Sequence, residues 1–185
     1  LHPICHPVVP GLPVVTASRS TLTGSAFTAE GSVSNLTLID AIWNLTGNSN
    51  LTNLVNDPSL IDFSAPQGGL FKALTVVNYK GDGTIALNTV LGADDSPSDK
   101  LVVNGGTASG PGLISIKPAG GGGAVTVANG ILVVDAINGA TTTTNAFALG
   151  GRVVAGPYEY TLQRSSVDAS APQSWFLRST IDCSA

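Results

Sequence analysis

The chain has 185 residues, a formal net charge of −4 and 11% charged residues, whereas an ordinary globular domain has about 25%. This acidic balance offers no basic patch for nucleic acid or an anionic membrane, and no apolar run approaches the roughly 20 residues of a membrane-spanning helix. With 22 glycines, 11 prolines and no methionine, the composition favours strands joined by tight turns over amphipathic helices.

The N-terminal part of the chain is rich in proline and small polar residues. Residues 1–13 carry four prolines, and because proline lacks a backbone N–H, no regular element of any length is expected there. Serine, threonine and other small residues then dominate up to residue 32. The sequence therefore predicts an irregular N-terminal segment over residues 1–32.

The cysteines and histidines lie close to the ends of the chain. His2, Cys5 and His6 are metal-ligand types at close spacing, but a fourth ligand is missing nearby, so we predict no metal site. Cys5 and Cys183 leave three states open: unpaired thiols, a disulfide between the termini, or pairing between chains. Because these histidines are the only two, the folded part lacks the general base of Ser/His or Cys/His catalysis.

A weak internal repeat follows in residues 33–65. Asn35-Leu-Thr37, Asn44-Leu-Thr46 and Asn50-Leu-Thr52 share one pattern, and residues 60–63 add another short strand. Such repeats are typical of a solenoid, in which each coil exposes an edge and an apolar face that only the next coil can cover. The triplets also match the N-glycosylation acceptor pattern, which occurs often by chance.

The segment Pro66-Gln67-Gly68-Gly69 predicts a turn. We place the main internal boundary there, with residues 33–65 as the last solenoid coils, residues 66–180 as a second unit and residues 181–185 as a tail.

The second unit begins with a predicted hairpin. A β-branched and aromatic run ends at Tyr79, Gly81-Asp82-Gly83 tolerates positive φ, and residues 84–87 resume period-two alternation. Residues 92–99 are predicted to be a polar loop because their proline, serine and aspartate residues favour turns. Residues 100–104 form the next predicted strand.

The polar loop contains the densest group of carboxylates. Asp94, Asp95 and Asp99 suggest a calcium site, but their order does not fit the EF-hand template. Paired carboxylates, or an acid beside Lys100, are also the groups that polysaccharide-cleaving enzymes use. We interpret the acids as solvated, with Asp99 or Ser98 bonding the backbone where the next strand begins.

Gly81-x-Gly83-x-x-Ala86 formally matches a dinucleotide-binding fingerprint, with Asp99 further along the chain. That fingerprint requires a helix that starts at the glycines, whereas residues 85–90 have the character of a strand. No nucleotide and no other cofactor is predicted.

Strand-like runs continue towards the C-terminus at a spacing of about ten residues, which is typical of an all-β fold. Tyr158, Tyr160 and Leu162 would share one face of a strand, and Trp175 and Leu177 one face of the last strand. Side chains of this size are suited to closing the end of a stack of strands, which otherwise exposes unpaired edges and an apolar floor.

These pieces form an ordered series over about residues 33–180. In chain order the series is Trp43-Asn44-Leu45-Thr46-Gly47, Ile61-Asp62-Phe63, Leu74-Thr75-Val76, Tyr79-x-Gly81-x-Gly83, Leu87-Asn88-Thr89-x-Leu91-Gly92, Ser98-Asp99-Lys100-Leu101-x-Val103, Gly130-Ile131-Leu132-Val133-Val134, Ala146-Phe147-x-Leu149, Val154-Ala155-Gly156-x-Tyr158-x-Tyr160-x-Leu162 and Trp175-x-Leu177-Arg178-Ser179. It resembles the C-terminal passenger region of AIDA-type and pertactin-like type V autotransporters.

The resemblance implies an all-β chain, a right-handed parallel β-helix ending in a β-rich, autochaperone-like cap. It further implies a non-catalytic fragment of a secreted or surface passenger, exported C-terminus first through the periplasm and outer membrane. The partners would be the upstream passenger and the translocator barrel, both outside this chain, as would be the secretion signal.

The resemblance and the strand pattern together predict a folding nucleus and cap. Its members are Tyr79, Gly81, Gly83, Leu87, Leu91, Asp99, Leu101, Val103, Ile116, Tyr158, Leu162 and Trp175. Two other functions stay open at this point: a surface that binds a host-cell receptor or matrix, and a β-helical carbohydrate-active enzyme that uses Asp94 or Asp99.

Overall fold

The computed structural model describes residues 14–181, which form strands, turns and loops and contain no helix within that range. The seventeen strands belong to an eleven-stranded and a six-stranded sheet. In chain order they are β1 (Val14–Ser18), β2 (Thr21–Gly24), β3 (Asn35–Ile39), β4 (Ile42–Leu45), β5 (Ser49–Asp57), β6 (Leu60–Phe63), β7 (Ala73–Gly81), β8 (Thr84–Thr89), β9 (Lys100–Asn104), β10 (Thr107–Ser109), β11 (Gly112–Pro118), β12 (Ile131–Ile137), β13 (Thr141–Thr142), β14 (Phe147–Leu149), β15 (Val153–Ala155), β16 (Tyr158–Arg164) and β17 (Trp175–Ile181).

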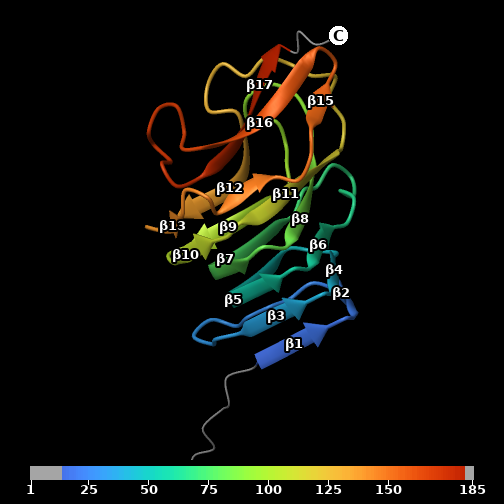
Figure 1. Ribbon diagram of the computed structural model, residues 1–185, viewed down its shortest axis with the longest axis vertical. Coiled ribbons are helices and arrows are strands. Elements are labelled where there is room, and N and C mark those ends of the chain that lie inside the picture. The colour runs from blue at the N-terminus through green and yellow to red at the C-terminus, as the bar shows by residue number, and fades with distance from the viewer. Residues whose placement is uncertain (1–13, 182–185) are drawn as a thin grey trace, which may run out of the picture.

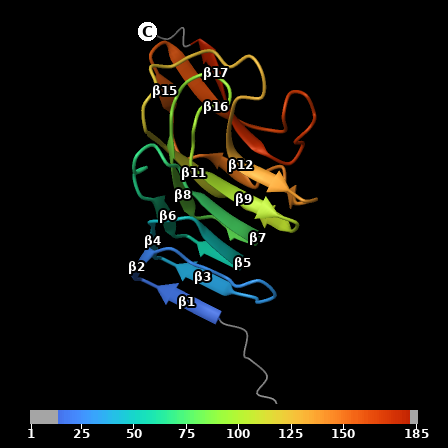
Figure 2. The ribbon, with the colours of Figure 1, turned by 180° about the vertical axis from the view of Figure 1, so that it is seen from behind.

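The strands stack as a parallel β-helix, so the predicted fold is confirmed. Figure 1 shows the coils rising from β1 at the bottom to the cap at the top, and Figure 2 shows the same order from behind. Three faces can be followed through the parallel pairs. The first face contains the first halves of β5 and β7, followed by β9 and β12. The second face contains β1, β3, the second halves of β5 and β7, β10 and β13. The third face contains β2, β4, β6, β8, β11 and β14.

The core lies inside this tube because alternate residues of each strand point inward. Parallel register then places inward residues of successive coils directly over one another, so apolar side chains form columns. The columns are Leu36, Leu54 and Tyr79 on the second face, Leu74, Leu101 and Val134 on the first, and Trp43, Ile61, Ile85 and Ile114 on the third.

The expectation of an irregular segment over residues 1–32 is wrong for part of the described range. β1 pairs with β3 over its whole length and β2 pairs with β4, both in parallel, so residues 14–24 make a regular coil. Strand preference depends strongly on neighbouring strands, and stacking here overrides a composition rich in Ser and Thr. Residues 25–34 do form a loop.

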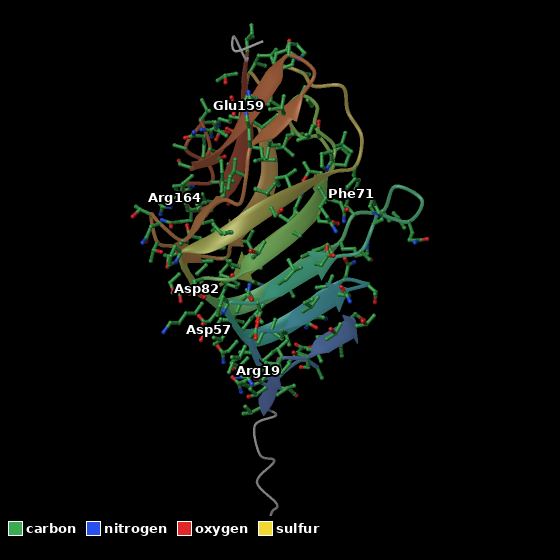
Figure 3. The ribbon with its side chains drawn as sticks, turned by 45° about the vertical axis from the view of Figure 1, so that its right-hand side comes forward. Arg19, Asp57, Phe71, Asp82, Glu159 and Arg164 are labelled. Carbon is green, nitrogen blue, oxygen red and sulfur yellow. The ribbon has the colours of Figure 1, made fainter. Side chains whose placement is uncertain are left out.

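The predicted hairpin around Gly81-Asp82-Gly83 is also wrong. β7 pairs with β5 and β9 in the larger sheet, whereas β8 pairs with β6 and β11 in the smaller one. The glycine segment is therefore a corner between two faces, and its neighbour one coil below is the β5–β6 corner. Figure 3 shows Asp57 and Asp82 on the same side of the stack, at these two corners.

The segment 66–69 lies in a loop that contains an antiparallel bridge between Gln67 and Leu70. The division placed there does not interrupt the stack, because β5 and β7 pair in parallel from Ser49–Leu74 onward.

Between the named strands of residues 14–181, the pairing becomes antiparallel at the cap. β12 pairs in parallel with β9 but antiparallel with β17, which is followed by the antiparallel neighbours β16 and β15. No helix in residues 14–181 is long and apolar enough to cross a membrane.

Candidate functional site: the cap and its polar anchors

The structure buries most of the predicted nucleus, but three positions lie at its margin. Among the apolar members, Tyr79, Leu87, Leu91, Leu101, Val103 and Trp175 are buried. Ile116, Tyr158 and Leu162 are only partly buried and pack against the core. Ile116 is less covered than Ile114 because β14 ends at Leu149, which lies over Ile114. The folding role of all these residues stays a prediction.

The Tyr79-x-Gly81-x-Gly83 motif is built around the buried side chain of Asn56. The Asn56 amide nitrogen donates to the Tyr79 hydroxyl at 3.3 Å, and the Asn56 carbonyl accepts from the backbone N–H groups of Asp82 and Gly83. A Cβ atom on Gly81 would lie 2.1 Å from the Asn56 carbonyl oxygen, and one on Gly83 would lie 2.4 Å from Asn56 Oδ1. Desolvation raises the pKa of Tyr79 to about 12. The motif therefore fixes a corner, and sequence reasoning missed Asn56.

Asp99 is fully buried, which contradicts its interpretation as a solvated acid. Its carboxylate accepts from the backbone N–H of Lys72 at 2.7 Å, from the backbone N–H of Asn88 at 2.9 Å and from the Asn88 amide at 2.6 Å. The expected bond to the backbone does exist, but it reaches other strands. Asp99 thus connects the start of β7, the end of β8 and the start of β9, and the three donors compensate for its burial.

Three side chains converge on the carbonyl groups at the end of β6. Lys72 donates its ammonium group to the carbonyls of Ser64 and Ala65, at 2.8 and 3.2 Å. The Asn88 amide also reaches the Ser64 carbonyl, and Lys117 forms an ion pair with Asp62. Together with Asp99, these groups hold the loop that leads from β6 to β7 against the stack.

The four consecutive glycines begin a strap, which we define as the loop 119–130 between β11 and β12. Its glycine Gly121 has a φ of +89°, and a Cβ there would lie 2.2 Å from the Leu91 carbonyl oxygen; at Gly123 the same atom would lie 1.9 Å from the Ala155 carbonyl oxygen. The strap therefore passes between Leu91 and Ala155, the last residue of the edge strand β15. Only glycine can approach both backbones this closely.

Substitution within the glycine run should give opposite results at adjacent positions. Gly121→Ala is expected to destabilise the chain by about 2–4 kcal/mol, because the added Cβ meets the Leu91 backbone at a positive φ. Gly122→Ala is the matched control, since a Cβ there meets no atom within 4 Å. Urea unfolding of both variants measures the difference, and equal midpoints would contradict the strap geometry.

Asp94 anchors the far end of the strap from outside. Its carboxylate accepts from the backbone N–H groups of Val127, Ala128 and Gly130 at 2.7 to 3.0 Å. Partial desolvation by itself would raise the pKa of Asp94, but these backbone donors together lower it below its ordinary value. The carboxylate form that accepts these bonds is therefore kept to a lower pH than in an ordinary aspartate.

The cap hairpin of β16 and β17 is fastened to the strap and the stack by polar side chains. Tyr160 is buried, donates its hydroxyl to the Gly92 carbonyl at 2.8 Å and accepts from the backbone N–H of Ala124 at 3.1 Å. Ser179 bonds Thr126 of the strap through both backbone and side chain. One hydroxyl therefore joins the cap, the loop after β8 and the strap.

A second group of bonds is centred on Thr142 in β13. The Trp175 indole N–H donates to its hydroxyl at 3.1 Å, and Arg164 donates to the hydroxyl and carbonyl of the same residue. Trp175 also packs edge-on against Phe147, with ring centroids 5.6 Å apart. Arg164 lies at the side of the cap in Figure 3. This arrangement attaches the last strand to the topmost parallel coil.

The described residues give no support for a metal or paired-carboxylate site. In residues 14–181 no group of three or more His, Cys, Asp or Glu side chains is placed to hold a metal ion. Asp99 is inside and Asp94 holds the strap, while Asp95 is exposed. The ligand types His2 and His6 and the possible disulfide of Cys5 and Cys183 fall outside the described residues.

Comparison with known proteins agrees with this architecture. The solved structure of the Haemophilus influenzae Hap adhesin superposes with a TM-score of 0.67 at 20% sequence identity, covering 89% of this chain and 17% of that one. At that identity the likeness shows the fold alone.

Sequence relatives are found among autotransporters. The autotransporter adhesin AIDA-I of Escherichia coli is 35% identical over 113 residues, 60% of this chain and 8% of the relative. The probable autotransporter YfaL of E. coli strain K12 is 38% identical over 142 residues, 74% of this chain and 10% of the relative. The adhesin BmaC autotransporter of Brucella suis is 39% identical over 118 residues, 60% and 3% of the two chains. The chain thus spans a tenth or less of these relatives.

A family model described as Autochaperone Domain Type 1 matches residues 49–162, which include Asn56, Asp99, the strap and Tyr160. Because that match covers more than half of the residues, the chain belongs to the Autochaperone Domain Type 1 family of autotransporters.

Proposed function

We propose that this chain nucleates folding of the passenger to which it belongs and templates the coils that precede it. The observation that carries the proposal is the difference between the two ends of the stack. The end formed by β15–β17, which we call closed, carries an antiparallel hairpin and the strap. At the other end, which we call open, β1 and β2 each pair on one side only within residues 14–181. A nucleus of this shape can grow in one direction only.

At the closed end, the antiparallel hairpin of β16 and β17 lies across the last parallel coil, and the strap passes beside Ala155 at the end of β15. A loop that crowds the end of an edge strand hinders the pairing of another strand there. Growth beyond the cap is therefore disfavoured.

At the open end, β1 and β2 each pair on one side only within the described residues. Val14 and Val15 are 66% and 52% exposed, and a mostly apolar hollow of about 290 Å³ between the two strands is lined by Leu22, Leu36, Trp43 and Leu51. An apolar floor beside two free strand edges is the surface that a preceding coil would cover. The upstream passenger is the partner we propose for it.

The difference between the two ends matters because of the order in which the chain would be exported. As an autotransporter the protein is secreted or displayed at the cell surface, across the outer membrane. If the passenger leaves the translocator barrel C-terminus first, the cap emerges and folds before the coils it will support. Nucleation is the slow step in a solenoid, and each later coil adds to an existing edge. The action is physical, and we propose no catalytic role.

Refolding kinetics of two tryptophan variants test this order. Trp175→Ala removes the buried ring that fastens the cap, so we expect refolding of the chain to slow by at least about tenfold. Trp43→Ala is the matched control, because Trp43 is also buried but lies in β4 near the open end. It should mainly speed unfolding.

Pulse-labelling hydrogen exchange during refolding follows the same order by strand. Amides of β9, β12, β16 and β17 should be protected before those of β1 to β4. Earlier protection of β1 to β4, or equal slowing by the Trp43 variant, would refute cap-first nucleation.

A further inference from the structure

A groove runs along the outer side of the first face, parallel to the axis of the β-helix. It consists of two adjoining hollows that share Asn48 and Ala73, one of about 480 Å³ towards the cap and one of about 300 Å³ towards the open end. We propose that this groove binds a neutral oligosaccharide. The site is separate from the edges and core on which the folding role rests.

The floor of the groove follows successive rungs of the sheet. Ala73 of β7 lies opposite Lys100 of β9, and its backbone N–H donates to Asn48, just before β5, at 2.9 Å. Leu132 of β12 lines the upper end. Neighbouring strands lie ~4.8 Å apart, which is comparable to the length of one pyranose ring in a chain. Consecutive sugars would therefore lie over consecutive rungs.

Polar groups in the groove are available to hydroxyls. Among residues 14–181, the Asn48 amide nitrogen, the Lys100 ammonium and the Asp95 carboxylate have no hydrogen-bond or ion-pair partner. Sugar hydroxyls can donate and accept, so they complement an amide, a cation and a carboxylate at once. One free cation and one free carboxylate favour a ligand without net charge. Lys72 also lines the groove, but its ammonium is engaged with carbonyls.

Each hollow is bordered by an aromatic side chain. Phe27 is 85% exposed and lines the lower hollow, and Phe71 lines the upper one at the edge of the stack, as Figure 3 shows. Phe71 is half-buried, so Phe27 offers a fully accessible apolar face and Phe71 a partial one, and such faces suit the apolar faces of sugar rings. The loop that carries Phe27 is held by Asn50, whose side chain bonds both the N–H and the carbonyl of Thr28. Phe27 is thus presented on a fixed loop, which reduces the ordering cost of binding.

The same groove is poorly suited to an extended peptide. Peptides that lie on sheets bind mainly by adding a strand to a free edge. Here β7 and β9 are paired on both sides, and the lower edge of β5 is occupied by Ala26 and Ser34 of the preceding loop. The groove offers side chains and rings but no free backbone edge.

Calorimetric titration of the 185-residue chain with neutral tetrasaccharides of glucose, galactose, mannose and N-acetylglucosamine tests the proposal. At least one should bind, and Phe27→Ala and Phe71→Ala should each weaken it roughly tenfold. Leu70→Ala is the matched control, because Leu70 is 75% exposed and lies outside the groove lining.

Two comparison ligands complete the experiment. A sulfated heparin tetrasaccharide and an unstructured peptide should bind more weakly than the best neutral sugar. Absence of binding by every neutral sugar, preference for heparin or the peptide, or equal weakening by Leu70→Ala would each overturn the proposal. The refolding rate of the Phe27 variant should equal that of the unsubstituted chain, so failure here leaves the folding role standing.

Discussion

Asp99→Ala is expected to destabilise the chain by about 3–5 kcal/mol, because it leaves buried donors without an acceptor. The backbone N–H groups of Lys72 and Asn88 and the Asn88 amide all point at this carboxylate. Removing it would also free the loop before β7 from the end of β8. Urea unfolding, followed by far-ultraviolet circular dichroism, measures the loss.

Two companion variants separate burial from charge. Asp95→Ala, four positions earlier and exposed, should change stability by no more than about 0.5 kcal/mol. The loss of stability in Asp99→Asn should lie between these two values, because the amide oxygen still accepts a hydrogen bond whereas the NH₂ group faces other donors. If Asp99→Ala and Asp95→Ala unfold at the same urea concentration, Asp99 does not anchor the corner.

Leu101→Asp should abolish the native state, with a loss exceeding about 4 kcal/mol. Leu101 is fully buried between Leu74 and Val134 of the adjacent coils, which are themselves fully buried and apolar. An aspartate there would have to be buried without a partner or break the stack. Near-ultraviolet circular dichroism and the emission of the buried tryptophans would report the loss of packing.

The control for this variant lies on the opposite side of the neighbouring strand. Thr75 in β7 is half-buried and faces outward, so Thr75→Asp should fold with stability close to that of the unsubstituted chain. A similar loss in both variants would mean that the first face tolerates no charge at all, and the inward assignment of Leu101 would then be unsupported.

The sequence predicts the positions of the strands better than it predicts which strands pair with one another. The β-branched and aromatic run that ends at Tyr79, the period-two alternation of residues 84–87 and the run 100–104 predicted β7, β8 and β9. The Gly81-Asp82-Gly83 segment, however, has the same local chemistry in a hairpin and in a solenoid corner. Only the pairing of β8 with β6 distinguishes them, and that depends on residues more than 20 positions away.

The sequence also does not indicate which polar side chains are buried. The sequence predicts a solvent-exposed Asp99, because an aspartate in a polar loop is usually exposed. Its environment is made by Lys72 and Asn88, which no local pattern connects to it. The burial of Asn56 could not be predicted for the same reason, because its partners Tyr79, Asp82 and Gly83 lie more than 20 residues away. The resemblance supplied the overall fold, but it did not say which polar groups hold the corners.

The hydrogen bond from Tyr160 to Gly92 spans 68 residues of chain. If export proceeds from the C-terminal end, as proposed above, this bond can form only when every residue between Gly92 and Tyr160 is already outside the membrane. Fully extended, that segment would measure roughly 230 Å. In that order of export, the cap would complete its contacts only after this long segment of unfolded chain had emerged, and only from then on would folding oppose backward movement of the chain.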